Sequence, residues 1–176
     1  MSNDTAAQAP IRVAILTVSD SAAQGRAEDV SGPVLKELVE AAQMQVVQTG
    51  VLPDDQDQIS AWLRRTAGAA DVLLTCGGTG LGPRDVTPEA TTQVIDYQVP
   101  GIAEALRASG LKHTPYAMLS RAVAGAVGNT LVVNLPGSPA AVRQQFEVLR
   151  SVLPHAMALL HGDTAHDNER KSPNEC

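Results

Sequence analysis

The chain has 176 residues, of which 44% are hydrophobic, enough to bury one substantial core without a second domain. Its net charge of −6 argues against a duplex-binding surface, which needs clustered lysines and arginines, and an aromatic content of 2% leaves few stacking platforms for nucleic-acid bases. We therefore expect a single domain that does not bind nucleic acid.

The two ends of the sequence lack the patterns of folded elements. Residues 1–10 have neither a basic stretch nor an apolar run, so they do not form a secretory signal peptide, and residues 162–176 are polar without periodicity. No segment approaches a membrane-spanning length, and two cysteines cannot form a disulfide framework. We expect one domain over residues 11–161, between disordered ends, in the cytoplasm and away from membranes.

The first half of the chain alternates β-prone and helical segments. The apolar run 11–18 predicts a buried parallel strand, and Ser31-Gly32-Pro33 predicts the start of a helix. Residues 45–52 predict a second strand, and apolar residues at helical spacing within 59–67 predict the next helix. Residues 71–76 predict a third strand.

The second half adds helices and an antiparallel hairpin. Thr87-Pro88 predicts an N-cap followed by a short helix to about residue 95, and another helix is expected after Pro100. Two β-prone runs within 121–135 flank a Gly-Asn pair at 128, which predicts a hairpin with a type II′ turn. The last segment, 139–160, predicts one long helix.

This order of elements predicts an α/β fold, a three-layer α/β/α sandwich with a mostly parallel mixed sheet and one β-hairpin. In such sheets ligands bind beyond the carboxyl ends of the strands. Four polar or glycine-bearing loops are expected at that edge: Ser19-Asp20-Ser21, Pro53-Asp54-Asp55, Gly77–Asp85 and Asn134–Ser138.

The loop after the third strand has the composition of an anion-binding loop. It holds four glycines within residues 77–82, followed by Arg84 and Asp85. Glycines allow positive φ and a close approach of backbone N–H groups to a ligand, although a tight turn without a ligand explains the glycines equally well. A cation beside a carboxylate favours phosphoryl or nucleotidyl transfer, in which Arg84 meets an anionic substrate and Asp85 holds magnesium. Neither a Walker loop nor a Gly-x-Gly-x-x-Gly helix start occurs.

Asp54 and Asp85 are the two carboxylates that we expect to face each other at this edge, because each follows a strand end. One or two carboxylates, with water and phosphate oxygens, suit Mg²⁺. An alternative for Asp54 or Asp55 is capping of the following helix, and Asp85 could instead hold its own glycine loop together. Ser138-Pro139 repeats the cap and proline of Thr87-Pro88, either as a second helix N-terminus aimed at the ligand or as a cap alone.

These motifs, taken in order, resemble the Mog/MoaB family of molybdenum-cofactor biosynthesis proteins. The resemblance covers about residues 11–160. Its motifs are Thr17–Ser21, Leu52-Pro53-Asp54, Gly77-Gly78-Thr79-Gly80, Arg84–Ala90, Leu119-Ser120-Arg121 and Asn134–Pro139.

The resemblance implies a homotrimeric molybdopterin adenylyltransferase that joins ATP to molybdopterin with Mg²⁺ and releases pyrophosphate. By this resemblance, Asp54 and Asp85 are the two required acidic residues. Together, this resemblance and the helix N-termini and charges described above predict the residues that bind the substrate and the nucleotide. They are Ser19, Asp20, Gly77, Gly78, Thr79, Gly80, Arg84, Thr87, Ser120, Asn134, Pro136, Gly137 and Ser138.

Three further points stay open from the sequence. The chain could be a MoaB-like protein that binds molybdopterin without adenylating it, or it could have a scaffold role. A partner protein could insert molybdate after the adenylation step.

Overall fold

The computed structural model describes residues 9–162, so the expected ends, 1–10 and 162–176, lie almost entirely outside the described residues. The strands are β1 (Arg12–Val18), β2 (Gln45–Leu52), β3 (Val72–Cys76), β4 (Tyr97–Gln98), β5 (Ala124–Val127) and β6 (Thr130–Leu135). The helices are α1 (Asp20–Ala23), α2 (Ser31–Ala41), α3 (Gln56–Thr66), α4 (Thr87–Thr92), α5 (Pro100–Leu111), α6 (Pro139–Arg150) and α7 (Leu153–Leu160), with a 3₁₀ helix, η1 (Pro115–Leu119).

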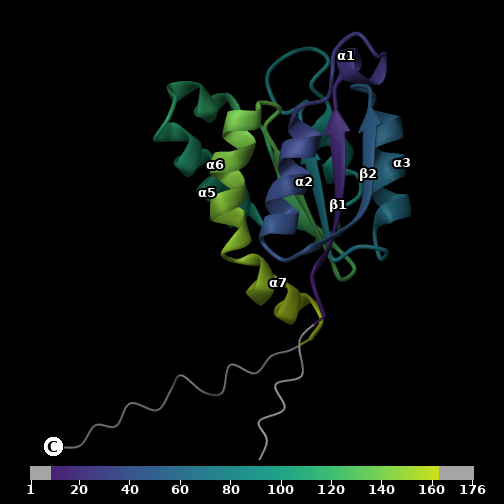
Figure 1. The fold of residues 1–176 in the computed structure, drawn as a ribbon, viewed down its shortest axis with the longest axis vertical. Helices are drawn as coiled ribbons and strands as arrows, with labels where there is room; N and C mark the ends of the chain where they lie inside the picture. Colours follow the sequence, from purple (N-terminus) through teal and green to yellow (C-terminus); the bar gives the residue numbers. More distant parts are fainter. Residues whose placement is uncertain (1–8, 163–176) are drawn as a thin grey trace, which may run out of the picture.

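The described strands form one mixed sheet in the order β2-β1-β3-β6-β5-β4. β1, β2, β3 and β6 are parallel, whereas β5 and β4 continue the sheet in antiparallel fashion. The predicted α/β class and mostly parallel sheet are therefore confirmed. Figure 1 shows α1 at the end to which the arrowheads of β1 and β2 point, which is where the carboxyl ends of the parallel strands lie.

Helices cover both faces of the sheet, and alternate residues of β1 point into two separate cores. Val13 and Ile15 belong to a core that they share with α2, α5, α6 and α7, including the buried Phe146. Ala14 and Leu16 belong to a second core, shared with α3 and α4. This alternation follows from the two-residue period of a strand, and it explains why a strand buried on both faces is apolar throughout.

The predicted long final helix is wrong, because α6 ends at Arg150 and α7 begins at Leu153. Pro154 stands in the first turn of α7. Proline has no backbone N–H and its ring clashes with the carbonyl four residues earlier, so a continuous helix through this position is disfavoured. Proline is tolerated in a first turn, where the two shorter helices place it.

Other elements differ in extent from the prediction. The polar loop after β1 contains the short helix α1, and α4 ends at Thr92 rather than near residue 95. The hairpin strand β5 begins at Ala124 rather than 121, while the turn has positive φ at Gly128 and at no other turn residue, as a type II′ turn requires. Neither β4 nor η1 was predicted, because both are very short.

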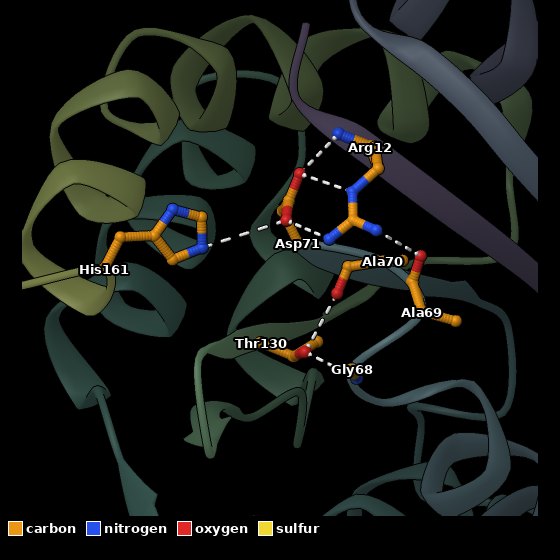
Figure 2. Close-up of polar contacts among 7 residues, drawn as sticks. All are labelled: Arg12, Gly68, Ala69, Ala70, Asp71, Thr130 and His161. Atoms are coloured by element: carbon orange, nitrogen blue, oxygen red, sulfur yellow. Dashed lines mark hydrogen bonds and ion pairs between the residues drawn. The ribbon is translucent and has the colours of Figure 1, made fainter. Parts of the chain in front are cut away.

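The amino ends of β1, β3 and β6 are held together by side chains (Figure 2). The guanidinium of Arg12 donates to both carboxylate oxygens of Asp71, at 2.8 and 3.3 Å, and the Arg12 backbone N–H donates to the same carboxylate at 2.8 Å. The Thr130 hydroxyl donates to the Ala70 carbonyl at 2.9 Å. These contacts fix this edge of the sheet, opposite the polar loops.

Between residues 9 and 162, no helix combines the length and apolar character needed to cross a bilayer.

Candidate functional site

A cavity of about 460 Å³ opens beyond the carboxyl ends of β1 and β3. β2 and β3 lie on opposite sides of β1, so the chain runs from β1 to β2 on one side and then crosses β1 to reach β3 on the other. Such a switch point separates the loops on either side and leaves a crevice, which is where open α/β sheets bind ligands. The end of β1, from Thr17 to Ser19, and the start of the loop after β3, Gly77 and Gly78, line the cavity.

Asp54 lines this cavity and does not cap α3. The capping residue is Asp55, whose carboxylate accepts from the Gln58 backbone N–H at 2.9 Å, which settles the alternative that the sequence left open. Asp54 Oδ2 instead accepts from the Asp20 backbone N–H at 3.0 Å, and Asp20 Oδ1 accepts from the Asp54 N–H at 3.1 Å. These reciprocal bonds join the loops after β1 and β2.

The pKa of Asp54 is raised above its ordinary value. Burial is the largest cause, and the charges of Asp20 and Asp85 act in the same direction, against a hydrogen bond from the Asp20 backbone. Burial destabilises the charged form of this carboxylate, and a bound cation would stabilise it.

Asp85 lines the same cavity from the other side, in the glycine loop (residues 77–86) between β3 and α4. Its Oδ2 accepts from the Gly82 backbone N–H at 2.8 Å, so the carboxylate also holds its own loop together, as the alternative interpretation proposed. The two roles are compatible, because a carboxylate has two oxygens and about four acceptor positions.

The glycines of this loop are required for two different reasons. Gly77 and Gly78 have φ of 106° and 62°, where side chains are disfavoured, and a Cβ on Gly77 would lie 2.2 Å from the Val18 carbonyl oxygen. At Gly80 and Gly82 the reason is the position of Asp85, since a Cβ would lie 2.9 and 2.8 Å from Asp85 Oδ2, at the end of a side chain that would have to move aside.

Arg84 is paired with Asp20 in this structure. Its Nε and Nη2 donate to the two carboxylate oxygens of Asp20 at 3.0 and 2.9 Å, in the two-pronged geometry that suits a guanidinium. The hydrogen bond from Arg84 is the main reason that the pKa of Asp20 lies below its ordinary value. Through Asp20, Arg84 is thus connected to Asp54.

One wall of the cavity was missed by the sequence analysis. It is formed by Glu28 and Asp29, before α2, and by Ser31, the first residue of α2. Asp29 accepts from the Thr17 hydroxyl at 2.8 Å and from the Gly32 N–H at 3.0 Å. An aspartate three residues before Gly32 is a recognisable capping pattern, but nothing local indicates that it faces a cavity.

Ser31 joins this wall to the loop after β6. Its hydroxyl donates to the Gly137 carbonyl at 2.6 Å, across 106 residues of sequence. Gly137 also lines the cavity and is closely packed, because a Cβ there would lie 3.3 Å from the Cα of Gly77.

The structure places the predicted substrate-binding residues in two groups. On the cavity wall, with Asp54 and Asp85, are Ser19, Gly77, Gly78 and Gly137. Not on the cavity wall are Asp20, Thr79, Gly80, Arg84, Thr87, Ser120, Asn134, Pro136 and Ser138.

Several residues of the second group have structural partners. The Thr87 hydroxyl donates to the Gly77 carbonyl at 2.9 Å, and the residue before α4 is Val86, so Thr87 is not the predicted N-cap. Ser138 does cap α6, by accepting from the Ala141 N–H at 3.2 Å. Asn134 is fully buried, and its amide donates to the hydroxyls of two threonines behind the glycine loop, at 3.0 and 2.8 Å.

The described residues that line the cavity include four carboxylates, from Glu28, Asp29, Asp54 and Asp85, and no lysine or arginine. Two helices of eleven and twelve residues, α2 and α6, begin at its wall and offer the partial positive charge of their N-termini. Within residues 9–162, no cluster of three or more metal-ligating side chains could hold a metal alone.

Sequence comparison matches residues 14–155 to a family described as a probable molybdopterin binding domain. The Drosophila melanogaster molybdenum cofactor synthesis protein cinnamon is 41% identical over 159 residues, covering 88% of this chain and 26% of cinnamon. A molybdopterin adenylyltransferase of Helicobacter pylori is 34% identical over 164 residues, covering 91% of this chain and 93% of that protein. The chain thus spans about a quarter of the first of these relatives and nearly all of the second.

Among solved structures, the molybdopterin biosynthesis enzyme MoaB of Thermus thermophilus is similar in both sequence and fold. It is 45% identical, has a TM-score of 0.81, and the match covers 86% of this chain and 97% of that one.

Proposed function

Since this chain belongs to the family of probable molybdopterin binding domains, we propose that it adenylates molybdopterin with ATP. The observation that carries the proposal is that Asp54 and Asp85, from different loops, line one cavity at the strand switch point together with Gly77 and Gly78. Similarity to proteins named molybdopterin adenylyltransferase along nearly their whole length supports the same activity.

In the proposed reaction, an oxygen of the terminal phosphate of molybdopterin attacks the α-phosphorus of ATP. A new P–O bond forms, the bond between the α-phosphorus and the bridging oxygen breaks, and pyrophosphate leaves. The substrates carry all the reacting atoms, so the protein needs no nucleophilic side chain. Its task is to hold two polyanions in line and to offset their repulsion.

The chain's own residues supply this positioning. Backbone N–H groups of the glycine loop and the N-termini of α2 and α6 would meet phosphate oxygens, because they are the partially positive groups at the cavity. We propose that Arg84 adds a full positive charge at the rim of the cavity. Arg84 is exposed and pairs with Asp20, whose backbone N–H bonds Asp54. We propose Ser120, Asn134, Pro136 and Gly137 as the residues that shape the pterin side.

Mg²⁺ suits the donors at this site. Asp54 and Asp85 each use Oδ2 for a backbone hydrogen bond, and no hydrogen bond among residues 9–162 engages Oδ1 of either residue. Two carboxylate oxygens with phosphate oxygens and water satisfy its preference for hard ligands. When bound, the ion would neutralise charge on the phosphates, which the acidic cavity itself cannot do.

The proposal includes a homotrimer in the cytoplasm and a partner protein that inserts molybdate into the product. Exposed apolar side chains at the end of α5 and in and beside η1 support an assembly surface: Leu111, Tyr116, Met118 and Leu119. Light scattering after gel filtration measures the assembly, and a monomeric mass would contradict it.

Pyrophosphate release tests the reaction. Purified protein with molybdopterin, ATP and Mg²⁺ is expected to release pyrophosphate, and Asp85→Asn is expected to lower the rate by at least about 100-fold, because it removes charge at the reacting phosphates. The variant keeps an oxygen that can accept from the Gly82 N–H, so its thermal midpoint should stay near that of the unmodified protein.

The outcomes separate the competing functions. Robust turnover by Asp85→Asn would refute the role of Asp85. A protein that binds molybdopterin but never releases pyrophosphate would be the MoaB-like alternative, and one that binds neither substrate would have a scaffold role.

A further inference from the structure

Arg121 lies between η1 and β5 and bonds to both the first and the second half of the glycine loop. Its backbone N–H donates to the Thr79 carbonyl at 2.9 Å, and its Nε donates to the Gly80 carbonyl at 2.7 Å. Its Nη2 donates to the carbonyl of Asp85 at 2.5 Å, and its Nη1 pairs with the Glu89 carboxylate in the first turn of α4. One side chain therefore connects the start of the loop, its end and the helix that follows.

Other contacts hold the start of the glycine loop, where the Gly77 N–H donates to the Leu135 carbonyl at 3.1 Å and the Gly77 carbonyl accepts from the Thr87 hydroxyl. Residues 81–84, at its tip, are exposed, and 66% of Leu81 is accessible to solvent. Inside the tip, the Asp85 N–H donates to the Gly82 carbonyl, and the Gly82 N–H donates to the Asp85 carboxylate. Both of these bonds lie within the turn, so the turn is placed relative to the rest of the molecule by Arg121 and by the exposed pair of Arg84 with Asp20.

We propose that Arg121 is a positioning residue that sets the Asp85 carboxylate at its place opposite Asp54. The inference rests on the proposed function, in which these two carboxylates act on the same phosphates. The planar guanidinium has five N–H donors in a rigid fork, so it can bond two carbonyls and a carboxylate at once. A lysine carries the same charge but has a single, mobile donor group, and it would not reproduce this arrangement.

The first experiment tests the loop without any substrate. In hydrogen exchange measured by mass spectrometry or NMR, Arg121→Ala is expected to speed exchange of the Gly82 and Asp85 amides at least about tenfold, because the loop opens more often. Arg64→Ala is the matched control. Arg64 also donates to a backbone carbonyl beside α4, that of Gln93 at 3.1 Å, but at the far end of the helix.

The second experiment measures binding of ATP in the presence of Mg²⁺ by calorimetry. Arg121→Ala is expected to raise Kd about tenfold, and Arg121→Lys to rescue little of this loss, whereas Arg64→Ala leaves Kd within about twofold. If Arg121 acts through Asp85, then Arg121→Ala in an Asp85→Asn background changes Kd by less than about twofold, because the two substitutions remove one shared effect. A merely stabilising arginine would give additive losses.

Each outcome bears on one of the two claims. Unchanged amide exchange, or additive losses in the double variant, would overturn the positioning role of Arg121 while leaving the proposed function intact. Should the unmodified protein not bind ATP with Mg²⁺, the proposed function would fall, whereas amide exchange would still decide whether Arg121 holds the glycine loop. Where Arg121→Ala does not fold, Arg121→Lys carries the same comparison, because it keeps the charge and most of the side-chain volume.

Discussion

At the scale of single residues, the charged Asp54 carboxylate at this site lowers the stability of the folded protein. Burial raises the pKa of Asp54, so the folded protein binds a proton there more tightly than the unfolded chain does. The charged form is therefore a cost at neutral pH, and the cost disappears as pH falls through the folded-state pKa. Residues held in such a state are typical of functional sites, where activity outweighs stability.

Asp54→Asn tests this conflict. The variant keeps an oxygen that can accept from the Asp20 N–H but loses the charge, so we expect it to be at least as stable as the unmodified protein at pH 7. Any gain in the free energy of unfolding should shrink toward pH 4, as Asp54 in the unmodified protein becomes protonated. Urea denaturation at both pH values measures this, and Mg²⁺-dependent ATP binding should weaken at least about tenfold, a difference of about 1.4 kcal/mol. A variant that is less stable and still binds normally would contradict this account.

At the scale of elements, the turn from β3 into the glycine loop is where backbone geometry builds the site. Gly77 combines a φ of 106° with a Cβ position 2.2 Å from the Val18 carbonyl, so the end of β3 approaches the end of β1 more closely than any side chain permits. This approach sets the start of the glycine loop, which carries Asp85, against the end of β1. A glycine in this turn is therefore required by sterics, whether or not a ligand binds.

Gly77→Ala should therefore destabilise the protein by at least about 2 kcal/mol, since strain at positive φ adds to a clash with backbone. Gly101→Ala is the control. Gly101 lies in the first turn of α5 with no atom near its Cβ position, and alanine there should be neutral or stabilise by up to about 1 kcal/mol. Equal thermal midpoints for the two variants would show that the turn can relax.

At the scale of the whole molecule, the carboxyl and amino ends of the parallel strands form two edges of the sheet with different roles. The carboxyl edge holds an acidic cavity, whereas the amino edge holds Arg12, Asp71 and His161 in contacts that join β1, β3 and the end of α7 (Figure 2). Burial alone would raise the pKa of Asp71, but hydrogen bonds and charge from Arg12 outweigh it, so the pKa of Asp71 is lowered. A lowered pKa stabilises the fold above the unfolded-state pKa, and the effect is lost as pH falls through the folded-state value.

Asp71→Asn is expected to cost about 1–3 kcal/mol at neutral pH, because it weakens a charge-assisted pair with Arg12. The difference from the unmodified protein should narrow in acid, where both lack the charge. ATP binding with Mg²⁺ should not change, since Asp71 lies at the opposite edge of the sheet. Guanidinium denaturation at pH 7 and pH 3 measures the stability difference, and calorimetry measures ATP binding. Weakened ATP binding would show that the two edges of the sheet are coupled.

Much of the fold and some of the site could be predicted because the responsible signals are local. An unbroken apolar, β-prone run such as 11–18 indicates a strand buried on both faces, and Ser138 before Pro139 indicates a helix start through its own hydrogen bond. The positive φ at Gly77 is likewise a local property, because glycine, without a Cβ, tolerates it. The order of such motifs was sufficient for the family resemblance, which the family match then confirmed.

The tertiary structure alone decided the partners of the polar side chains. It assigned the cap to Asp55 and the cavity to Asp54, paired Arg84 with Asp20, and brought Arg121 onto the glycine loop. Apart from the cap, these contacts join residues separated by tens of positions, where a charge has many candidate partners and no periodicity selects among them. Local sterics and alternation are encoded within a few residues, whereas the choice of a distant partner depends on how the whole sheet brings its loops to one edge.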